Sequence, residues 1–184
     1  GDGTYSYVFG TDLYTLYMPS LRHRLLLMVF GDIVEQALNV TYDFVPEQLP
    51  GPFTFDLSRD IVATTSCNEC HGRLGSQLGD ASFHGGSRYT VEGCATCHVS
   101  TLGDGFAEIT PLIHGIHAAK LISDDPDDPL DFTEVTYPQD LRNCTKCHAG
   151  PDGSNWNTRP SIVACGSCHA EVVFVTGYVH VGVL

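Results

Sequence analysis

The stretch His84-Gly85-Gly86-Ser87-Arg88-Tyr89-Thr90-Val91-Glu92-Gly93-Cys94-Ala95-Thr96-Cys97-His98, followed by His114-Gly115-Ile116-His117, decides how this chain folds. A single Cys-x-x-Cys-His motif lies in its middle, and three histidines outside any such motif surround it. This motif is the attachment signature of c-type haem, in which two thiols bond to the porphyrin and the next imidazole binds the iron. The iron needs a sixth ligand, and the other histidines are candidates to supply it.

The same motif occurs four times along the chain. Together the four copies contain all eight cysteines and four of the nine histidines. Four motifs without a cysteine outside them predict four covalently bound c-type haems. The predicted haem-attachment residues are Cys67, Cys70, Cys94, Cys97, Cys144, Cys147, Cys165 and Cys168, and the predicted proximal iron ligands are His71, His98, His148 and His169.

Other cysteine chemistry fits this pattern less well. Four Cys-x-x-Cys pairs are enough ligands for two tetrahedral zinc sites, but zinc gives no reason for a histidine after every second cysteine. A thioredoxin-like redox pair occurs once, near a βαβ pattern, which is absent here. Disulfides within each motif would close very small loops and add little stability.

Length and composition predict an irregular fold. Four haems in 184 residues would form much of the interior, which relaxes the need for a large apolar side-chain core. The 19 glycines and 10 prolines agree with irregular backbone. We therefore predict a mostly irregular multihaem cytochrome with short helices around the haems and a small β-rich N-terminal portion.

The formal net charge of −13 restricts the partners of the chain. Nucleic acid is excluded as a partner because phosphate binding needs clustered Lys and Arg. Cationic partners and oxidised metal species are favoured. The longest apolar run, Leu25 to Phe30, is six residues long, so no membrane span is predicted. Because haem is attached to thiols outside the cytoplasm, we expect an exported protein with Gly1 as a processed N-terminus.

The N-terminal third differs from the rest of the chain. Residues 1–60 contain no haem motif, whereas residues 61–184 contain all four, which predicts a haem-free β-rich region followed by a tetrahaem domain. Alternating apolar residues predict short strands, whereas the segment Ser20 to Leu38 fits either a helix or a strand pair. The alternating sets are Tyr5, Tyr7 and Phe9; Val40, Tyr42 and Phe44; and Phe53, Phe55 and Leu57.

One short pattern in this region has two interpretations. Asn39-Val40-Thr41 fits a glycosylation sequon, although such tripeptides often arise by chance.

From about Asp60 to His180 the sequence resembles the cell-surface multihaem cytochromes of metal-reducing bacteria, the OmcA/MtrC type. The resemblance covers about two thirds of the chain, and its most specific part is the string from Tyr137 to His148. The matching pieces are Ser66–His71, His84-Gly85-Gly86, His114-Gly115-Ile116-His117, Tyr137-Pro138-Gln139-Asp140-Leu141-Arg142-Asn143-Cys144-Thr145-Lys146-Cys147-His148, Trp156–Pro160 and Ala164–His169.

This resemblance implies a function and a set of distal ligands. Members of the family pass electrons to extracellular acceptors, such as oxidised metals, through closely spaced bis-histidine haems. By this resemblance the distal iron ligands would be His84, His114, His117 and His180, which leaves His23 outside the set. With both axial positions filled, no iron can bind substrate, so we expect an electron-transfer protein and not an enzyme. The expected partners are other redox cytochromes, and the expected location is extracellular or at the cell surface.

The chain also departs from the family pattern. A fifth motif is expected shortly after His180, but the chain ends at Leu184, and it has no N-terminal cysteine for a lipid anchor. These features predict a tetrahaem subunit that assembles with copies of itself into a conductive filament. The alternatives are a monomeric surface or periplasmic electron shuttle, and a multihaem reductase with one open haem site.

Overall fold

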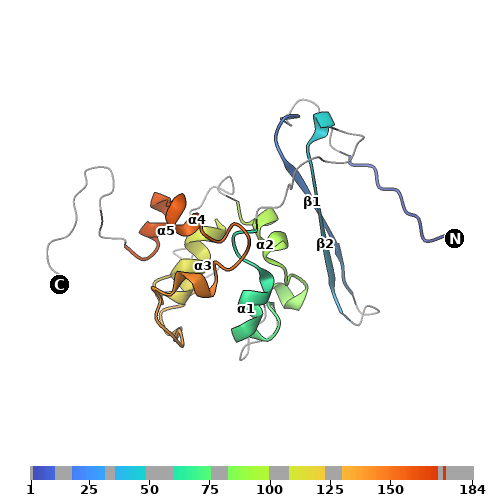
Figure 1. Cartoon of the computed structure of the whole chain (residues 1–184). Coiled ribbons are helices and arrows are strands. Elements are labelled where there is room, and N and C mark those ends of the chain that lie inside the picture. Colours follow the sequence, from blue (N-terminus) through green and yellow to red (C-terminus); the bar gives the residue numbers. More distant parts are fainter. Residues whose placement is uncertain are drawn as a thin grey trace. The chain divides into compact units, whose positions relative to one another are not determined.

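The computed structural model describes residues 2–10, 18–31, 36–48, 60–75, 83–99, 108–122, 130–169 and 172 (Figure 1). The chain forms two compact units. One contains Gly1–Leu25 and Tyr42–Ser58, and the other contains Leu26–Thr41 and Arg59–Leu184.

Strands β1 (His23–Val29) and β2 (Leu38–Phe44) form a two-stranded sheet. Leu25, Leu27 and Val29 are exposed, whereas the residues between them are half-buried, as the two-residue period of a strand requires. The strand predicted around Val40 is confirmed. Of the two structures proposed for Ser20 to Leu38, a helix or a strand pair, the described residues show a strand, β1, whose partner β2 begins at Leu38.

The strand predicted at Tyr5, Tyr7 and Phe9 is wrong. These residues have no regular secondary structure, and the side chains of Tyr5 and Tyr7 are 93% and 80% exposed. Alternation favours a strand only where a neighbouring strand pairs with the backbone and one face is covered. The third predicted strand, Phe53 to Leu57, lies outside the described residues.

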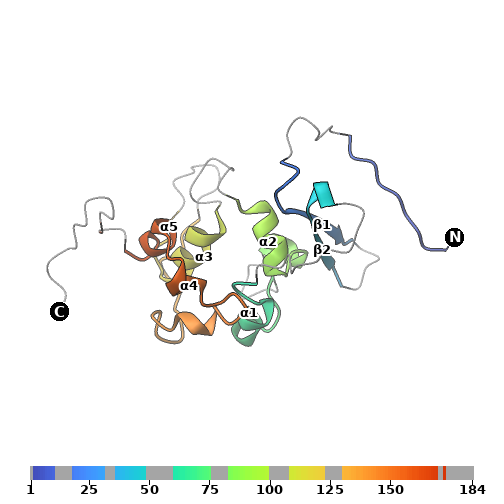
Figure 2. The ribbon, with the colours of Figure 1, turned by 45° about the horizontal axis from the view of Figure 1, so that its top comes forward.

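The second unit contains short helices joined by irregular segments, as both views show (Figure 1; Figure 2). This agrees with the predicted fold class of short helices, irregular backbone and a small sheet. Short 3-10 turns are described as well: η1 (Pro46–Gln48), η2 (Phe83–Gly86) and η4 (Cys144–Lys146). The α-helices are α1 (Thr64–His71), α2 (Val91–Cys97), α3 (Ile109–His117), α4 (Asn155–Thr158) and α5 (Ile162–Gly166).

Threonine hydroxyls cap helix α2 and link it to α1. Thr90 caps α2 by accepting a hydrogen bond from the Gly93 amide at 3.2 Å. Thr64, in the first turn of α1, accepts a bond from the Val91 amide at 3.0 Å and donates one to Glu92 at 3.4 Å. Because Thr64 contacts the first turn of α2, it ties together the helices that carry the first two motifs.

Asn39 on β2 is bonded to the segment that precedes α2. Its side-chain amide donates to the Ser87 carbonyl at 2.9 Å, and its side-chain oxygen accepts from the Tyr89 amide at 3.0 Å. The second unit therefore includes part of the sheet together with the motif region. The division into a haem-free region and a haem domain near residue 60 stays a prediction. No helix in the described ranges has both the length and the apolar character that a membrane crossing requires.

Candidate haem-binding sites

The four motifs share one local geometry, a single helical turn. In three of them the backbone amide of the histidine donates to the carbonyl of the first cysteine at 2.9 Å: His98 to Cys94, His148 to Cys144, and His169 to Cys165. The first motif lies in the last turn of α1. Residues i and i+4 share one side of such a turn. Each motif therefore presents a thiol and an imidazole on the same side.

Three motif histidines face a histidine from elsewhere in the chain. The ring centroids of His71 and His117 are 6.2 Å apart, those of His98 and His84 are 6.0 Å apart, and those of His148 and His114 are 6.2 Å apart. Two imidazoles bound to one metal, each through a bond of about 2 Å, place their ring centres about 6 Å apart. The observed spacing is that of a bis-histidine iron site.

Helix α3 orients two of the partner imidazoles. The Nδ1 atom of His114 lies 2.9 Å from the Thr110 carbonyl, and that of His117 lies 2.8 Å from the Ile113 carbonyl. A carbonyl accepts only, so these contacts require Nδ1–H and leave the Nε2 lone pair available to a metal. The two histidines are three residues apart, yet each faces a different motif.

The partner of the second motif is held by a turn. His84 has a φ of 47°, and Gly85 and Gly86 follow with φ values of 65° and 77°. Left-handed backbone costs a residue with a side chain roughly 1–2 kcal/mol, whereas glycine adopts it freely. This explains the His84-Gly85-Gly86 pattern, and a strained residue of this kind is typical of functional sites.

A cavity of about 370 Å³ lies at the second motif, and the sequence analysis missed one of its residues. Among the described residues that line it, Arg88 is the single Lys, Arg, Asp or Glu. The available signal was position, since Arg88 lies between a candidate distal ligand and the motif. The lining residues are His84, Arg88, Gly93, Cys94, Cys97 and His98.

Burial makes the paired imidazoles suitable ligands. The pKa is lowered, chiefly by burial, for His71, His84, His114 and His148. A lowered pKa favours the neutral imidazole, which is the form that binds metal. In addition, the Nδ1 atom of His148 is buried and makes no hydrogen bond with the described residues. The side chains present therefore fit the predicted haem iron.

The first three motifs lie near one another. Burial raises the pKa of Cys67 to about 11, and the nearby thiols of Cys147 and Cys94, from two other motifs, add to the increase. Lys146 in the third motif forms an ion pair with Glu69 in the first. The Tyr137 ring packs edge-on against His117, with centroids 5.5 Å apart.

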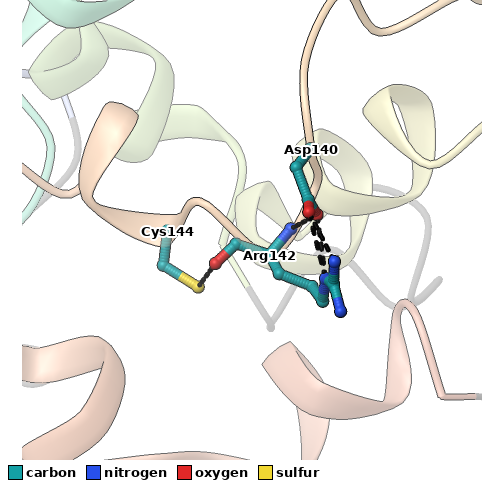
Figure 3. Close-up of polar contacts among 3 residues, drawn as sticks. All are labelled: Asp140, Arg142 and Cys144. Atoms are coloured by element: carbon teal, nitrogen blue, oxygen red, sulfur yellow. Dashed lines mark hydrogen bonds and ion pairs between the residues drawn. The ribbon is translucent and has the colours of Figure 1, made fainter.

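The backbone before the third motif is held by an ion pair (Figure 3). The guanidinium of Arg142 donates to the Asp140 carboxylate at 2.6 Å, and the Arg142 amide donates to the same carboxylate at 2.9 Å. The Cys144 thiol donates to the Arg142 carbonyl at 3.4 Å. These contacts define the turn that leads into the motif.

The fourth motif is described, but its predicted distal ligand is not. His169 is exposed, and its predicted partner His180 lies outside the described residues. The Lys120 ammonium, beyond the end of α3, donates to the Cys168 carbonyl at 2.6 Å. His23 lies on β1, where its Nε2 atom is 3.0 Å from the Met18 carbonyl.

The zinc interpretation has no ligand set in the described part of the chain. All eight cysteines are described there, and no group of three or more Cys, His, Asp or Glu comes together as a metal site. Six of the described histidines instead come together in three pairs.

The family described as outer membrane cytochrome MtrC/MtrF-like, domains II/IV, matches residues 59–182. The chain belongs to this family. The resemblance predicted for about residues 60–180 is thus confirmed. The chain is similar to the multiheme cytochrome MtrC of Shewanella baltica (strain OS185), with 30% identity over 97% of this chain and 26% of the relative.

The crystal structure of MtrC from Shewanella baltica OS185 is similar as well. It has a TM-score of 0.67 and 29% sequence identity over 94% of this chain and 27% of that one. The chain thus spans about a quarter of the relative.

Proposed function

We propose that this chain is an electron-transfer domain that carries four covalently bound c-type haems with two histidine ligands each. The observation that carries the proposal is the set of three imidazole pairs with ring centroids 6.0 to 6.2 Å apart. The assigned pairs are His71 with His117, His98 with His84, His148 with His114, and His169 with His180.

The side chains have separate tasks in this proposal. When bound, a c-type haem supplies an iron that takes up and releases one electron. The cysteines would hold the porphyrin through thioether bonds, so the haem could not dissociate. The paired imidazoles would bind the iron and keep substrate away from it. Helix α3 holds two of these imidazoles on one rigid element, which keeps the sites of the first and third motifs at a fixed separation.

The partners follow from family and charge. We propose extracellular electron transfer at the cell surface, from redox partner cytochromes to acceptors such as oxidised metals, without enzymatic activity. The net charge of −13 supports cationic acceptors. The division at residue 60 into a haem-free β-rich region and a tetrahaem domain belongs to the same proposal.

Two readouts test this proposal. The 184-residue chain, produced with haem-attachment machinery, should have an intact mass of 19.9 kDa plus four haems after denaturation. It should also pass electrons from a low-potential donor to a soluble ferric complex. The bare polypeptide mass would refute the proposal.

A reductase is the second candidate for the same chain. A high-spin iron together with turnover of nitrite or a sulfur oxyanion would select it. Self-assembly into a filament, as opposed to a monomeric shuttle, is a separate prediction from the sequence. Negative-stain microscopy of native material distinguishes filaments from single particles.

A further inference from the structure

Arg88 is the charged side chain of the cavity at the second motif. The other described residues that line it are the two cysteines and two histidines assigned to one haem, together with Gly93. Guanidinium keeps its charge at every pH at which proteins fold, and its planar N–H groups match a carboxylate in a two-bond pair. A haem carries carboxylates on its propionate groups, so the chemistry of the cavity is complementary to its expected occupant.

The backbone on both sides of Arg88 is held in place. Asn39 bonds to the Ser87 carbonyl at 2.9 Å and to the Tyr89 amide at 3.0 Å. Gly75 packs so closely behind this segment that a Cβ there would lie 2.3 Å from the Arg88 carbonyl oxygen. These contacts give Arg88 a defined position.

Arg88 also differs from the cations at the third motif. There, Lys146 pairs with Glu69, and Arg142 pairs with Asp140. Arg88 forms no ion pair with a carboxylate in the ranges that the structure describes. No described carboxylate therefore competes with a ligand for its charge.

We propose that Arg88 binds a carboxylate of the haem at the second motif and raises the reduction potential of that haem, and that Asn39 is the positioning residue that keeps Arg88 in the cavity. This inference rests on the proposed function, since it requires a haem attached to Cys94 and Cys97. A fixed positive charge near a haem stabilises the reduced state, which carries one positive charge less than the oxidised state.

The test is a redox titration of the haem-loaded chain, fitted with four one-electron components. Arg88→Gln should shift the one-electron reduction equilibrium of one component about tenfold towards the oxidised form. This corresponds to a fall of about 59 mV in the reduction potential of that component. Arg88→Lys, which keeps the charge, should shift that component less. The matched control is Arg159→Gln, which removes one exposed charge that does not line the cavity and should leave all four components in place.

Two further variants locate the effect. His84→Met should raise the potential of the haem at the second motif and so mark its component, because methionine ligation raises haem potentials. In that background, Arg88→Gln should shift the marked component. Asn39→Ala should lower the reduction potential of the same component. Combining Asn39→Ala with Arg88→Gln should lower that potential little further, since both substitutions act through one guanidinium.

The outcomes separate the two proposals. Intact mass shows whether each variant carries four haems. A wild-type chain without haem at the second motif would refute the proposed function and this inference with it. Four haems with no shift in Arg88→Gln, or equal shifts in Arg88→Gln and Arg159→Gln, would overturn this inference and leave the proposed function intact.

Discussion

The first and third motifs obtain their partner imidazoles from a helix, whereas the second obtains its partner from a turn. On α3, regular geometry places His114 and His117, and backbone carbonyls orient both rings. At the second motif, His84 is held in left-handed backbone before two glycines of positive φ. Regular spacing and backbone carbonyls fix the direction of the ligands on a helix, whereas the position of a ligand on a turn depends on what packs behind the turn. The two arrangements should therefore respond differently to substitution.

Removing a helix-held imidazole should have the largest effect. His117→Ala should make the haem at the first motif high-spin, and His114→Ala should do the same at the third, because each ring faces one motif histidine. Absorption and electron paramagnetic resonance spectra of the oxidised protein measure this. His23→Ala is the control and should leave every haem low-spin; loss of a low-spin signal in that variant would show that the ligand assignment is wrong.

The backing of the turn can be tested with two glycines of similar φ. Gly72 and Gly75 have φ values of 67° and 82°, but only the Cβ added at Gly75 would clash, at 2.3 Å from the Arg88 carbonyl oxygen. In both alanine variants, backbone strain should lower the free energy of unfolding by about 1–3 kcal/mol. The decrease should be larger for Gly75→Ala, which should also disturb the spectrum of the haem at the second motif. Chemical denaturation measures the free energy of unfolding, and equal losses would contradict this packing.

A smaller effect is expected at the helix cap of the second motif. Thr90 accepts a hydrogen bond from the Gly93 amide, so Thr90→Ala should lower the free energy of unfolding by about 1 kcal/mol. Thr158→Ala is the control, because its hydroxyl donates to a backbone carbonyl on an exposed segment. If Thr158→Ala lowers the free energy of unfolding as much as Thr90→Ala does, the loss at Thr90 cannot be attributed to the cap of α2.

The smallest effect concerns the turn before the third motif. Hydrogen bonds from Arg142 lower the pKa of Asp140 to about 2. A carboxylate with a lowered pKa stabilises the fold above its unfolded pKa, near 3.8, and this contribution is lost as the pH falls towards 2. Arg142→Gln should raise the Asp140 pKa in an NMR titration and leave the melting temperature at pH 7 almost unchanged, because the pair is exposed.

The sequence predicted the repeated features well and the individual contacts poorly. Four motifs of the same Cys-x-x-Cys-His pattern indicated the fold class, and β2 followed from its two-residue period. The exposed segment at Tyr5 shows why the same period failed elsewhere, because no described strand pairs with it. The position of Arg88 between His84 and the second motif was a signal in the sequence, but its proposed role also depends on Asn39, which lies 49 positions earlier in the chain. The pairing of His114 with one motif and His117 with another also depends on tertiary packing, which spacing does not specify.

Electron paramagnetic resonance of the fully oxidised protein, integrated against its haem content, tests the central claim most directly. If every motif histidine is paired with a second imidazole, the spectrum should contain low-spin ferric signals that account for all four haems. A high-spin ferric signal equal to one haem or more per chain would contradict the account, because at least one iron would then lack its second histidine.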